Sequence, residues 1–258
     1  MKPKKQYGQH FLTDDRIAHQ IANGFQYSGK TKNVLEIGPG KGMLTKHLKV
    51  QDYKLKCVEL DLDMVEILEK TYPELIDNII SEDVLRVNME EVFHGEEFLL
   101  IGNYPYNISS QILFKMIDSR DYIPEMVGMF QKEVAQRVVA KSGNKTYGVI
   151  SVLIQAYYDG DYLFDVDANS FFPPPKVTSG VIRLRRKDNF KLNCNEKLFK
   201  AVVKTSFGQR RKMLRNTLKS LIQDPDILSQ ELFTKRPEQL DLEHFISITQ
   251  LIEGLQKK

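Results

Sequence analysis

The sequence has few of the features that mark secreted, membrane or metal-binding proteins. Its two cysteines, Cys57 and Cys194, are isolated and too few for a disulfide framework. No CxxC or HxxxH pair occurs, and no apolar run approaches the roughly 18 residues that a membrane span needs. The basic first ten residues lack the apolar stretch of a secretory signal. We therefore predict a cytoplasmic protein that contacts no membrane and holds no metal.

Apolar runs alternate with amphipathic segments over most of the chain. Strands are predicted over 33–38, 54–60, 78–81, 98–103, 126–131, 162–166 and 181–186. Helices are predicted after the caps Thr13 and Asp14, after Gly42, and over 63–72, 109–117, 132–141 and 148–158. Strands that alternate with helices imply an α/β fold with a doubly wound, mostly parallel sheet of seven strands. The last two strands are expected to form an antiparallel pair.

The basic residues concentrate in the carboxyl-terminal part of the chain. Residues 185–258 hold 16 Lys and Arg against 9 Asp and Glu, a net charge of +7, which leaves −4 for residues 1–184. The segment Lys197–Lys219 holds eight cationic side chains and no acidic one. Strand patterns also stop after Asn189, and the rest is predicted to be helical. We predict two domains, 1–187 with the sheet and a small, basic, helical domain 188–258.

The first predicted strand ends in EIGPGKG, with Gly38, Gly40 and Gly42 at alternate positions. Sheets of this kind bind ligands at the carboxyl ends of their strands, and glycine lets the backbone approach a ligand closely. The spacing departs from the GxGxxG of dinucleotide sites, which disfavours a bound pyrophosphate. A cofactor loop is therefore predicted, with a plain strand-to-helix turn as the alternative.

Acidic residues follow the next two predicted strands. Glu59, followed by Asp61, suits the two hydroxyl groups of a ribose, with a solvated charge as the alternative. Asp83 in SEDVL could accept from an adenine amine, or could cap a helix. Because the strand ends meet at one edge of the sheet, the three strand-end features together favour a nucleoside ligand.

The fourth predicted strand, LLIGN, runs directly into Asn103-Tyr104-Pro105-Tyr106. An Asn-X-Pro-aromatic sequence offers a side-chain amide oxygen, a backbone carbonyl and an aromatic ring at one rim of the sheet. The two acceptors could take both hydrogens of an exocyclic amine and aim its lone pair at an electrophile, while the ring stacks on the base. A proline turn between core tyrosines is the alternative.

These motifs together resemble the S-adenosylmethionine-dependent ribosomal RNA adenine dimethyltransferase family, in its small-subunit branch. The segments that carry the resemblance are KKQYGQHFL, EIGPGKGMLT, VELD, SEDVL, NYPYNIS and FFPPPKVTSG. The resemblance implies a Rossmann-like methyltransferase fold and S-adenosyl-L-methionine as the cofactor. The cofactor contacts that it implies are His10, Leu12, Gly38, Gly40, Glu59, Asp83 and Asn103. The catalytic residues that it implies are Asn103, Tyr104, Pro105, Tyr106 and Phe171.

Two of these residues depart from the family's usual pattern. Tyr104 stands where the family usually has leucine, which matters little if the position contributes only its carbonyl. His10 stands where asparagine is frequent. In FFPPPKV the prolines favour a stiff extended loop, and the family pattern implies that Phe171 faces the adenine opposite Tyr106.

The segment SFGQRRKMLRNTL resembles the start of the family's carboxyl-terminal domain in its ribosomal form. Arg211, Arg215 and Lys219 recur every four residues, so on one helix they would form a like-charged stripe that RNA phosphates could stabilise. The RNA-binding residues predicted here are Arg210, Arg211, Lys212, Arg215 and Lys219.

The resemblance implies that the protein methylates the exocyclic N6 of two adjacent adenosines near the 3′ end of small-subunit ribosomal RNA, giving dimethyladenosine. Its partner would be that RNA within a pre-ribosomal small subunit, with no DNA expected and a monomeric enzyme. One alternative is a large-subunit methylase of the antibiotic-resistance type, which the QRRK segment disfavours. Another is a non-catalytic RNA-binding assembly factor of the same fold, which the intact motif from Asn103 to Tyr106 disfavours.

Overall fold

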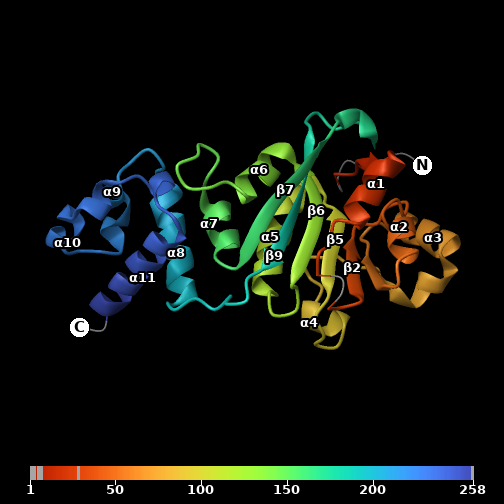
Figure 1. Cartoon of the computed structure of the whole chain (residues 1–258), viewed down its shortest axis with the longest axis horizontal. Coiled ribbons are helices and arrows are strands. Elements are labelled where there is room, and N and C mark those ends of the chain that lie inside the picture. The colour runs from red at the N-terminus through yellow and green to blue at the C-terminus, as the bar shows by residue number, and fades with distance from the viewer. Residues whose placement is uncertain (1–3, 5–7, 28–29, 257–258) are drawn as a thin grey trace. The chain divides into compact units, whose positions relative to one another are not determined.

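The computed structural model describes residues 4, 8–27 and 30–256 (Figure 1). The chain divides into two compact units, Met1–Ala135 with Gly160–Arg186, and Gln136–Asp159 with Lys187–Lys258. It therefore passes between the units three times. The last passage follows Arg186, one residue before the end of the first predicted domain. That residues 1–187 and 188–258 are the functional domains stays a prediction.

The first unit is built on a seven-stranded sheet with the strand order β4-β3-β2-β5-β6-β9-β7. Its strands are β2 (Asn33–Ile37), β3 (Lys54–Val58), β4 (Ile79–Ile80), β5 (Leu99–Asn103), β6 (Glu125–Gln131), β7 (Tyr158–Val166) and β9 (Ser179–Arg186). The strands from β4 to β6 in this order pair parallel, whereas β9 runs antiparallel to β6. The predicted seven-stranded, mostly parallel sheet is confirmed.

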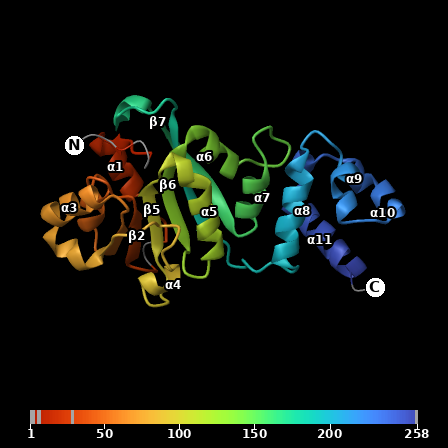
Figure 2. The ribbon, with the colours of Figure 1, turned by 180° about the vertical axis from the view of Figure 1, so that it is seen from behind.

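Helices lie on both faces of this sheet, as the full burial of β2 requires. They are α1 (Asp15–Ala22), α2 (Thr45–Lys49), α3 (Leu62–Thr71), α4 (Met89–Val92), α5 (Ser109–Asp118) and α6 (Lys132–Val138), which runs on into the second unit. On one face, Ile21 of α1 and Leu48 of α2 join Val34 of β2 in an apolar cluster. In the view from behind, α5 lies in front of the sheet (Figure 2). Its buried residues include Ile112 and Met116.

Two short strands that the sequence analysis did not predict form a second, two-stranded sheet. These are β1 (Phe11–Leu12) and β8 (Phe171–Phe172), which pair antiparallel with Phe11 opposite Phe172 and Leu12 opposite Phe171. Thr13 extends the contact, because its amide nitrogen donates to the Ser170 carbonyl at 2.8 Å. The pairing holds the amino-terminal segment beside the proline-rich loop.

Several predicted element ends are confirmed and others are not. The Asp14 side chain caps α1 by accepting from the amide nitrogens of Arg16 and Ile17. The predicted helix 148–158 is shorter, since α7 spans Val149–Gln155 and Tyr158 begins β7. The predicted helix 132–141 ends at Val138.

The second unit is mainly helical, and the predicted helical structure after Asn189 is confirmed. After α7, its helices are α8 (Glu196–Gly208), α9 (Leu214–Thr217), α10 (Pro225–Ser229) and α11 (Leu242–Gln256), with 3-10 turns at Leu218–Ser220, Glu231–Thr234 and Pro237–Gln239. Its core includes Phe199, Phe233 and Phe245, none of them more than 1% exposed. The rings of Phe207 and Phe245 stack with centroids 5.9 Å apart.

The predicted single helix carrying Arg211, Arg215 and Lys219 is wrong. Helix α8 ends at Gly208, and α9 begins only at Leu214 and spans four residues. Tertiary packing explains why no single helix forms here. Leu214 and Leu218 are fully buried, and the Leu214 amide nitrogen donates to the Lys235 carbonyl at 2.9 Å. The basic residues therefore lie on a turn and on short helical pieces, and repulsion along one helix face does not apply.

Three further findings concern the described part of the chain. Each of its helices is too short or too polar to span a lipid bilayer. Both cysteines are free, with Cys57 buried and Cys194 half-buried. The same residues contain no group of three or more His, Cys, Asp or Glu side chains placed to hold a metal ion.

Candidate active site

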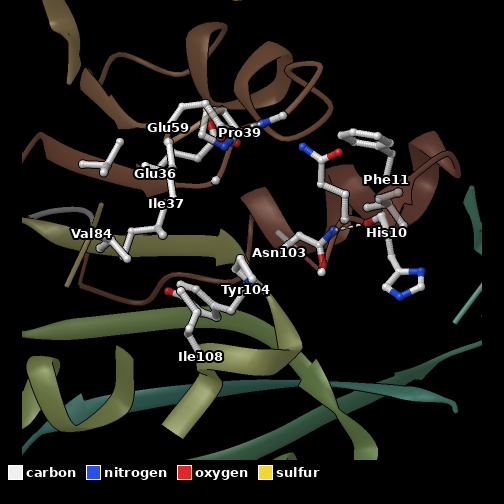
Figure 3. A pocket seen from close by; sticks show the side chains of 18 of the residues that line it. His10, Phe11, Glu36, Ile37, Pro39, Glu59, Val84, Asn103, Tyr104 and Ile108 are labelled. Carbon is white, nitrogen blue, oxygen red and sulfur yellow. Dashed lines mark hydrogen bonds between the residues drawn. The ribbon is translucent and has the colours of Figure 1, made fainter. Parts of the chain in front are cut away.

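A cavity of about 350 Å³ lies at the carboxyl ends of β2, β3 and β5 in the first unit (Figure 3). The strand register places it there, because Ile37 at the end of β2 is opposite both Val58 of β3 and Gly102 of β5. Each predicted strand-end motif therefore reaches the same space. Its size is within the range of small-ligand pockets.

The glycine loop after β2 forms one wall of the cavity. Gly38 and Gly40 have φ angles of +64° and +55°, in the left-handed region that favours glycine. The Gly38 amide nitrogen donates to the Val58 carbonyl at 2.9 Å, which ties the loop to β3. A Cβ atom at Gly38 would meet only Pro105, at 4.0 Å, so a side chain there would extend into the cavity.

Glu59 lies at the end of β3, only 8% exposed, and its carboxylate has two fixed oxygens. One accepts from the Gly40 amide nitrogen at 3.0 Å and the other from the Asp61 amide nitrogen at 2.9 Å. Burial raises the pKa of Glu59, against the lowering effect of these hydrogen bonds. Each oxygen keeps a second lone pair, so the oriented carboxylate can still accept from a ligand.

Asp61 does not line the cavity. Its carboxylate instead binds two residues of the amino-terminal segment. Its buried carboxylate accepts from Lys4 Nζ at 2.6 Å and from Gln9 Nε2 at 2.7 Å. Burial favours the neutral acid, but the hydrogen bonds from Lys4 and Gln9 outweigh it and lower the pKa of Asp61. Asp61 also caps α3 by accepting from the Asp63 amide nitrogen.

Asp83 makes a local hydrogen bond and lies at the cavity, and its contact with an adenine amine stays a prediction. Its Oδ1 accepts from the Leu85 amide nitrogen at 2.9 Å, which is a local cap. It also lines the cavity, where the carboxylate's remaining lone pairs can accept from a ligand.

Glu36, in the middle of the EIG strand, is a lining residue to which the sequence analysis gave no role. It is 1% exposed, and Thr45 Oγ1 donates to its Oε2 at 2.7 Å. Burial raises the pKa of Glu36 to about 8. An acid inside an otherwise apolar strand was the signal available from sequence.

The cavity is acidic. Among its described lining residues are four acidic side chains, Glu36, Glu59, Glu82 and Asp83, and one lysine, Lys41. The raised pKa of Glu36 leaves that acid largely protonated at neutral pH. Lys41 Nζ lies 5.1 Å from the centroid of the Phe11 ring. Such a lining favours a ligand that carries positive charge and disfavours a pyrophosphate, in agreement with the departure from GxGxxG.

Asn103 ends β5 on the opposite side of the cavity from Glu59 (Figure 3). Its Nδ2 donates to the His10 backbone carbonyl at 2.9 Å. Since the nitrogen is engaged there, the amide oxygen is the end that can accept from a substrate amine. Tyr104, Pro105 and Tyr106 follow it along the chain and also line the cavity.

The Tyr104 ring is accommodated by two glycines that the sequence analysis did not single out. A Cβ at Gly128 would lie 1.9 Å from the ring, and one at Gly102 would lie 2.9 Å from it. The ring is 1% exposed and packs against Phe130 with centroids 4.9 Å apart. Its hydroxyl has no hydrogen-bond partner among the described residues, and burial raises the pKa of Tyr104 well above its usual value.

Two contacts position the Tyr106 side chain, one at its hydroxyl and one on the face of its ring. Its hydroxyl is hydrogen-bonded to Ser179 Oγ, and its ring stacks on the His10 imidazole with centroids 5.6 Å apart and an interplanar angle of 25°. Burial raises the pKa of Tyr106. His10 and Leu12, predicted as cofactor contacts, both line the cavity.

The structure does not place Phe171 as predicted. Phe171 is 4% exposed and packs in the apolar cluster with Leu12, whereas its neighbour Phe172 is 58% exposed and lines the cavity. Successive side chains of a strand point to opposite sides, so the pairing of β8 with β1 decides which ring faces inward. A stacking role for Phe171 would need a different side-chain arrangement from this one.

The predicted RNA-binding residues belong to the second unit and are not among the lining residues of this cavity. Arg211, Lys212, Arg215 and Lys219 are exposed. Among the residues that the structure describes, none of these four has a carboxylate within 4.0 Å. Arg210 is half-buried and donates to the Asn144 carbonyl at 3.3 Å.

Comparison with known proteins gives a consistent result along the whole chain. Residues 1–255 match the family model described as ribosomal RNA adenine dimethylase. A protein of Flavobacterium johnsoniae named ribosomal RNA small subunit methyltransferase A is 53% identical over 254 residues, which are 98% of this chain and 97% of that protein. A protein of the same name from Cytophaga hutchinsonii is 50% identical over 255 residues, 98% of each chain.

Solved structures agree with this sequence likeness. A dimethyladenosine transferase from Plasmodium falciparum superposes with a TM-score of 0.76 at 26% identity, over 96% of this chain and 98% of that one. The 23S rRNA methyltransferase ErmE gives a TM-score of 0.70 at 22% identity, over 93% and 99%, which shows a shared fold.

Proposed function

The chain belongs to the ribosomal RNA adenine dimethylase family, and from this premise we propose that it methylates small-subunit ribosomal RNA with S-adenosyl-L-methionine. Its products would be two adjacent N6,N6-dimethyladenosines near the 3′ end of that RNA. The observation that carries the proposal is the register of β2, β3 and β5, which brings Gly38, Glu59 and Asn103 to one cavity.

The donor set fits this cofactor. S-adenosylmethionine carries sulfonium and ammonium cations with one carboxylate, and the described cavity lining has four acidic side chains and a single lysine. Glu59 would accept from the two ribose hydroxyls, and Asp83 from the adenine amine. The backbone at Gly38 leaves room for the methionine part, because a Cβ there would meet only Pro105. When bound, the cofactor supplies an electrophilic methyl group.

Asn103 and Tyr104 would orient the target amine. The lone pair of an adenine amine is conjugated with the ring, so the nitrogen is a poor nucleophile. The Asn103 amide oxygen and the Tyr104 carbonyl would accept its two hydrogens, which favours a pyramidal nitrogen with its lone pair aimed at the methyl group. After one transfer the amine keeps one hydrogen, so one acceptor can still orient it for the second.

The basic residues of the second unit would hold the RNA. Arg211, Lys212, Arg215 and Lys219 are exposed cations with no described ion-pair partner, as phosphate contacts require. A target base must leave its stack to enter a cavity, so adenosines already exposed in a hairpin loop are favoured. We further propose that the protein acts in the cytoplasm, as a monomer, on a pre-ribosomal small subunit.

Incubation of unmodified small subunits with methyl-labelled cofactor tests the proposal. Label in small-subunit RNA, and none in large subunits treated identically, is the expected result. The Asn103→Ala variant, at equal concentration, serves as the matched control and should transfer far less label. Label confined to large-subunit RNA would move the protein to the resistance-type activity, and no label with intact RNA binding would favour an assembly factor.

A further inference from the structure

The turn after β4 carries Asp83, and a lysine from a distant part of the sequence is hydrogen-bonded to this turn. Asp83 Oδ1 accepts from the Leu85 amide nitrogen at 2.9 Å, and the Leu85 carbonyl accepts from Lys115 Nζ at 3.0 Å. We infer that Lys115 is a positioning residue for Asp83 and thereby strengthens the preference of the cavity for an adenine base. The inference rests on the proposed function, since it concerns the cofactor end of that same cavity.

The hydrogen bonds within the turn are local. The Asp83 carbonyl accepts from the amide nitrogens of Arg86 and Val87, at 2.8 and 3.3 Å. These bonds set the shape of the turn. The bond from Lys115 adds a contact with a residue 30 positions later in the sequence, which fixes the turn against the rest of the first unit.

Helix α5, which carries Lys115, is itself well anchored. Ile112 and Met116, on the same helix, are buried. At its first turn, Ser109 Oγ donates to the Pro105 carbonyl at 3.2 Å. The helix therefore contacts both the motif that would orient the target amine and the turn that would bind the adenine of the cofactor.

Lys115 acts on the turn and not on the ligand. It is half-buried and is not among the described lining residues of the cavity, whereas Asp83 and Leu85 are. Partial burial lowers the pKa of Lys115, and the carboxylates of Asp118, Asp83 and Glu82 act in the opposite direction. Within the described chain, none of these carboxylates lies within 4.0 Å of the ammonium group. The hydrogen bond to Leu85 is thus the route by which Lys115 affects the site.

This route predicts which part of the cofactor is affected by the loss of Lys115. The Leu85 carbonyl and amide belong to one residue, so a shift of the carbonyl moves the amide that orients the Asp83 carboxylate. A misplaced carboxylate accepts less well from the adenine amine. The proposed ribose and methionine contacts, Glu59 and Gly38, follow other strands and should not respond.

Two variants of Lys115 and one control test the inference. Lys115→Met keeps the length of the side chain and removes the donor, whereas Lys115→Arg keeps a donor and should rescue. Lys56→Met is the matched control, because the half-buried Lys56 also donates to a backbone carbonyl, that of Val92, at 2.7 Å. Neither Lys56 nor Val92 is among the described lining residues of the cavity.

Two ligands separate the base from the rest of the cofactor. S-adenosylhomocysteine carries the exocyclic amine, whereas S-inosylhomocysteine has a carbonyl oxygen in its place and the same ribose and amino-acid parts. In wild type, calorimetry should give a Kd about 10–100-fold lower for S-adenosylhomocysteine, because the analogue leaves the carboxylate without its donor.

Loss of the lysine donor should reduce this preference. In Lys115→Met the ratio of the two Kd values should fall by about threefold or more, through weaker binding of S-adenosylhomocysteine, because a misplaced acceptor loses part of a charge-assisted hydrogen bond. The Kd of S-inosylhomocysteine should stay near wild type. Lys115→Arg and Lys56→Met should keep the wild-type ratio, and the thermal midpoint of each variant is measured alongside.

A wild-type ratio in Lys115→Met would overturn the inference, whether both affinities are unchanged or fall together. An equal fall of the ratio in Lys56→Met would also overturn it, because the effect would then follow from stability. So would a wild-type chain that binds both ligands equally, since Asp83 would then make no contact with the amine. These outcomes leave the proposed methyl transfer intact. That proposal fails instead, and the inference with it, if the wild-type chain binds neither ligand and transfers no label to small-subunit RNA.

Discussion

The cavity of the first unit and the basic segment Lys197–Lys219 of the second use opposite electrostatics. The described cavity lining has four acidic side chains and one lysine, and the buried Glu59 is fixed by hydrogen bonds from two backbone amides. The basic segment has eight cations and no acid. The cavity therefore suits a small cationic ligand held by geometry, whereas the basic segment suits a long polyanion held by charge. Changes in the cavity should act on chemistry and cofactor affinity, and changes in the basic segment on RNA affinity and its salt dependence.

The largest effect is expected for Asn103→Ala. Loss of the amide oxygen removes one of the two acceptors that orient the amine, and should lower the single-turnover methylation rate by about 10²–10³-fold. RNA affinity in filter binding should stay near wild type, because the amide contacts no phosphate. Equal losses of rate and RNA affinity would make Asn103 a structural residue and blur the division between the two regions.

Glu36→Gln should change how the stability of the cofactor-free chain depends on pH. Burial raises the pKa of Glu36 from 4.5 to about 8, so the folded chain holds a proton that the unfolded chain releases. Wild-type stability therefore falls as the pH rises from about 4.5 to about 8. Relative to wild type, the free energy of unfolding of the variant should rise by up to about 2–4 kcal/mol across that window, since one pKa unit corresponds to 1.36 kcal/mol. Parallel stability curves for both chains, measured with urea at several pH values, would contradict this.

Glu59→Ala should weaken cofactor binding by about 1–3 kcal/mol, because two ribose hydroxyls lose a charged acceptor. The matched control is Glu82→Ala, an exposed acid that also lines the cavity, and it should cost less. Calorimetry at two salt concentrations checks both variants. An unchanged affinity in Glu59→Ala would remove that residue from the site.

Neutralising Arg211, Arg215 and Lys219 together should weaken RNA binding and flatten its salt dependence. The slope of log K against log salt should fall by up to about 0.7–0.9 for each RNA phosphate that the variant no longer neutralises. Cofactor affinity should not change, because these residues do not line the cavity.

A second triple variant tests whether position or net charge matters. Replacement of Lys30, Lys54 and Lys70 by alanine removes the same charge from exposed sites of the first unit. RNA binding should respond much less to this change. Equal effects of the two triple variants would mean that the basic segment is not a specific RNA surface.

The smallest effect is expected for Tyr104→Phe. The hydroxyl is buried without a described partner, so its removal should leave stability unchanged or raise it by about 1 kcal/mol. Thermal unfolding measures this. A loss of cofactor affinity in the variant would show that the hydroxyl is a ligand contact, and a loss of stability would show a partner for it.

The sequence predicted those features that depend on the order of strands and the motifs at their ends. Parallel strands meet at one edge, so Gly38, Glu59, Asp83 and Asn103 could be expected together, and the structure brings them to one cavity. Their binding roles stay predictions. The predicted seven-stranded sheet is confirmed. It could be predicted because each of its strands has its own apolar run.

Features that depend on long-range packing could not be predicted. Phe171 and Phe172 are identical residues, and only the pairing of β8 with β1 decides which ring is buried. The spacing of Arg211, Arg215 and Lys219 suggested a helix, but the burial of Leu214 and Leu218 ends it. The stacking of the His10 ring on Tyr106 likewise joins two segments that are distant in the sequence.

We propose that the protein methylates adenosine N6 twice, at neighbouring positions of small-subunit RNA. Nuclease digestion and mass spectrometry of small subunits, treated with the protein and unlabelled cofactor, measure the product and its position together. We expect dimethyladenosine at two adjacent positions near the 3′ end. Monomethyladenosine as the sole product, or modification elsewhere in the RNA, would contradict it.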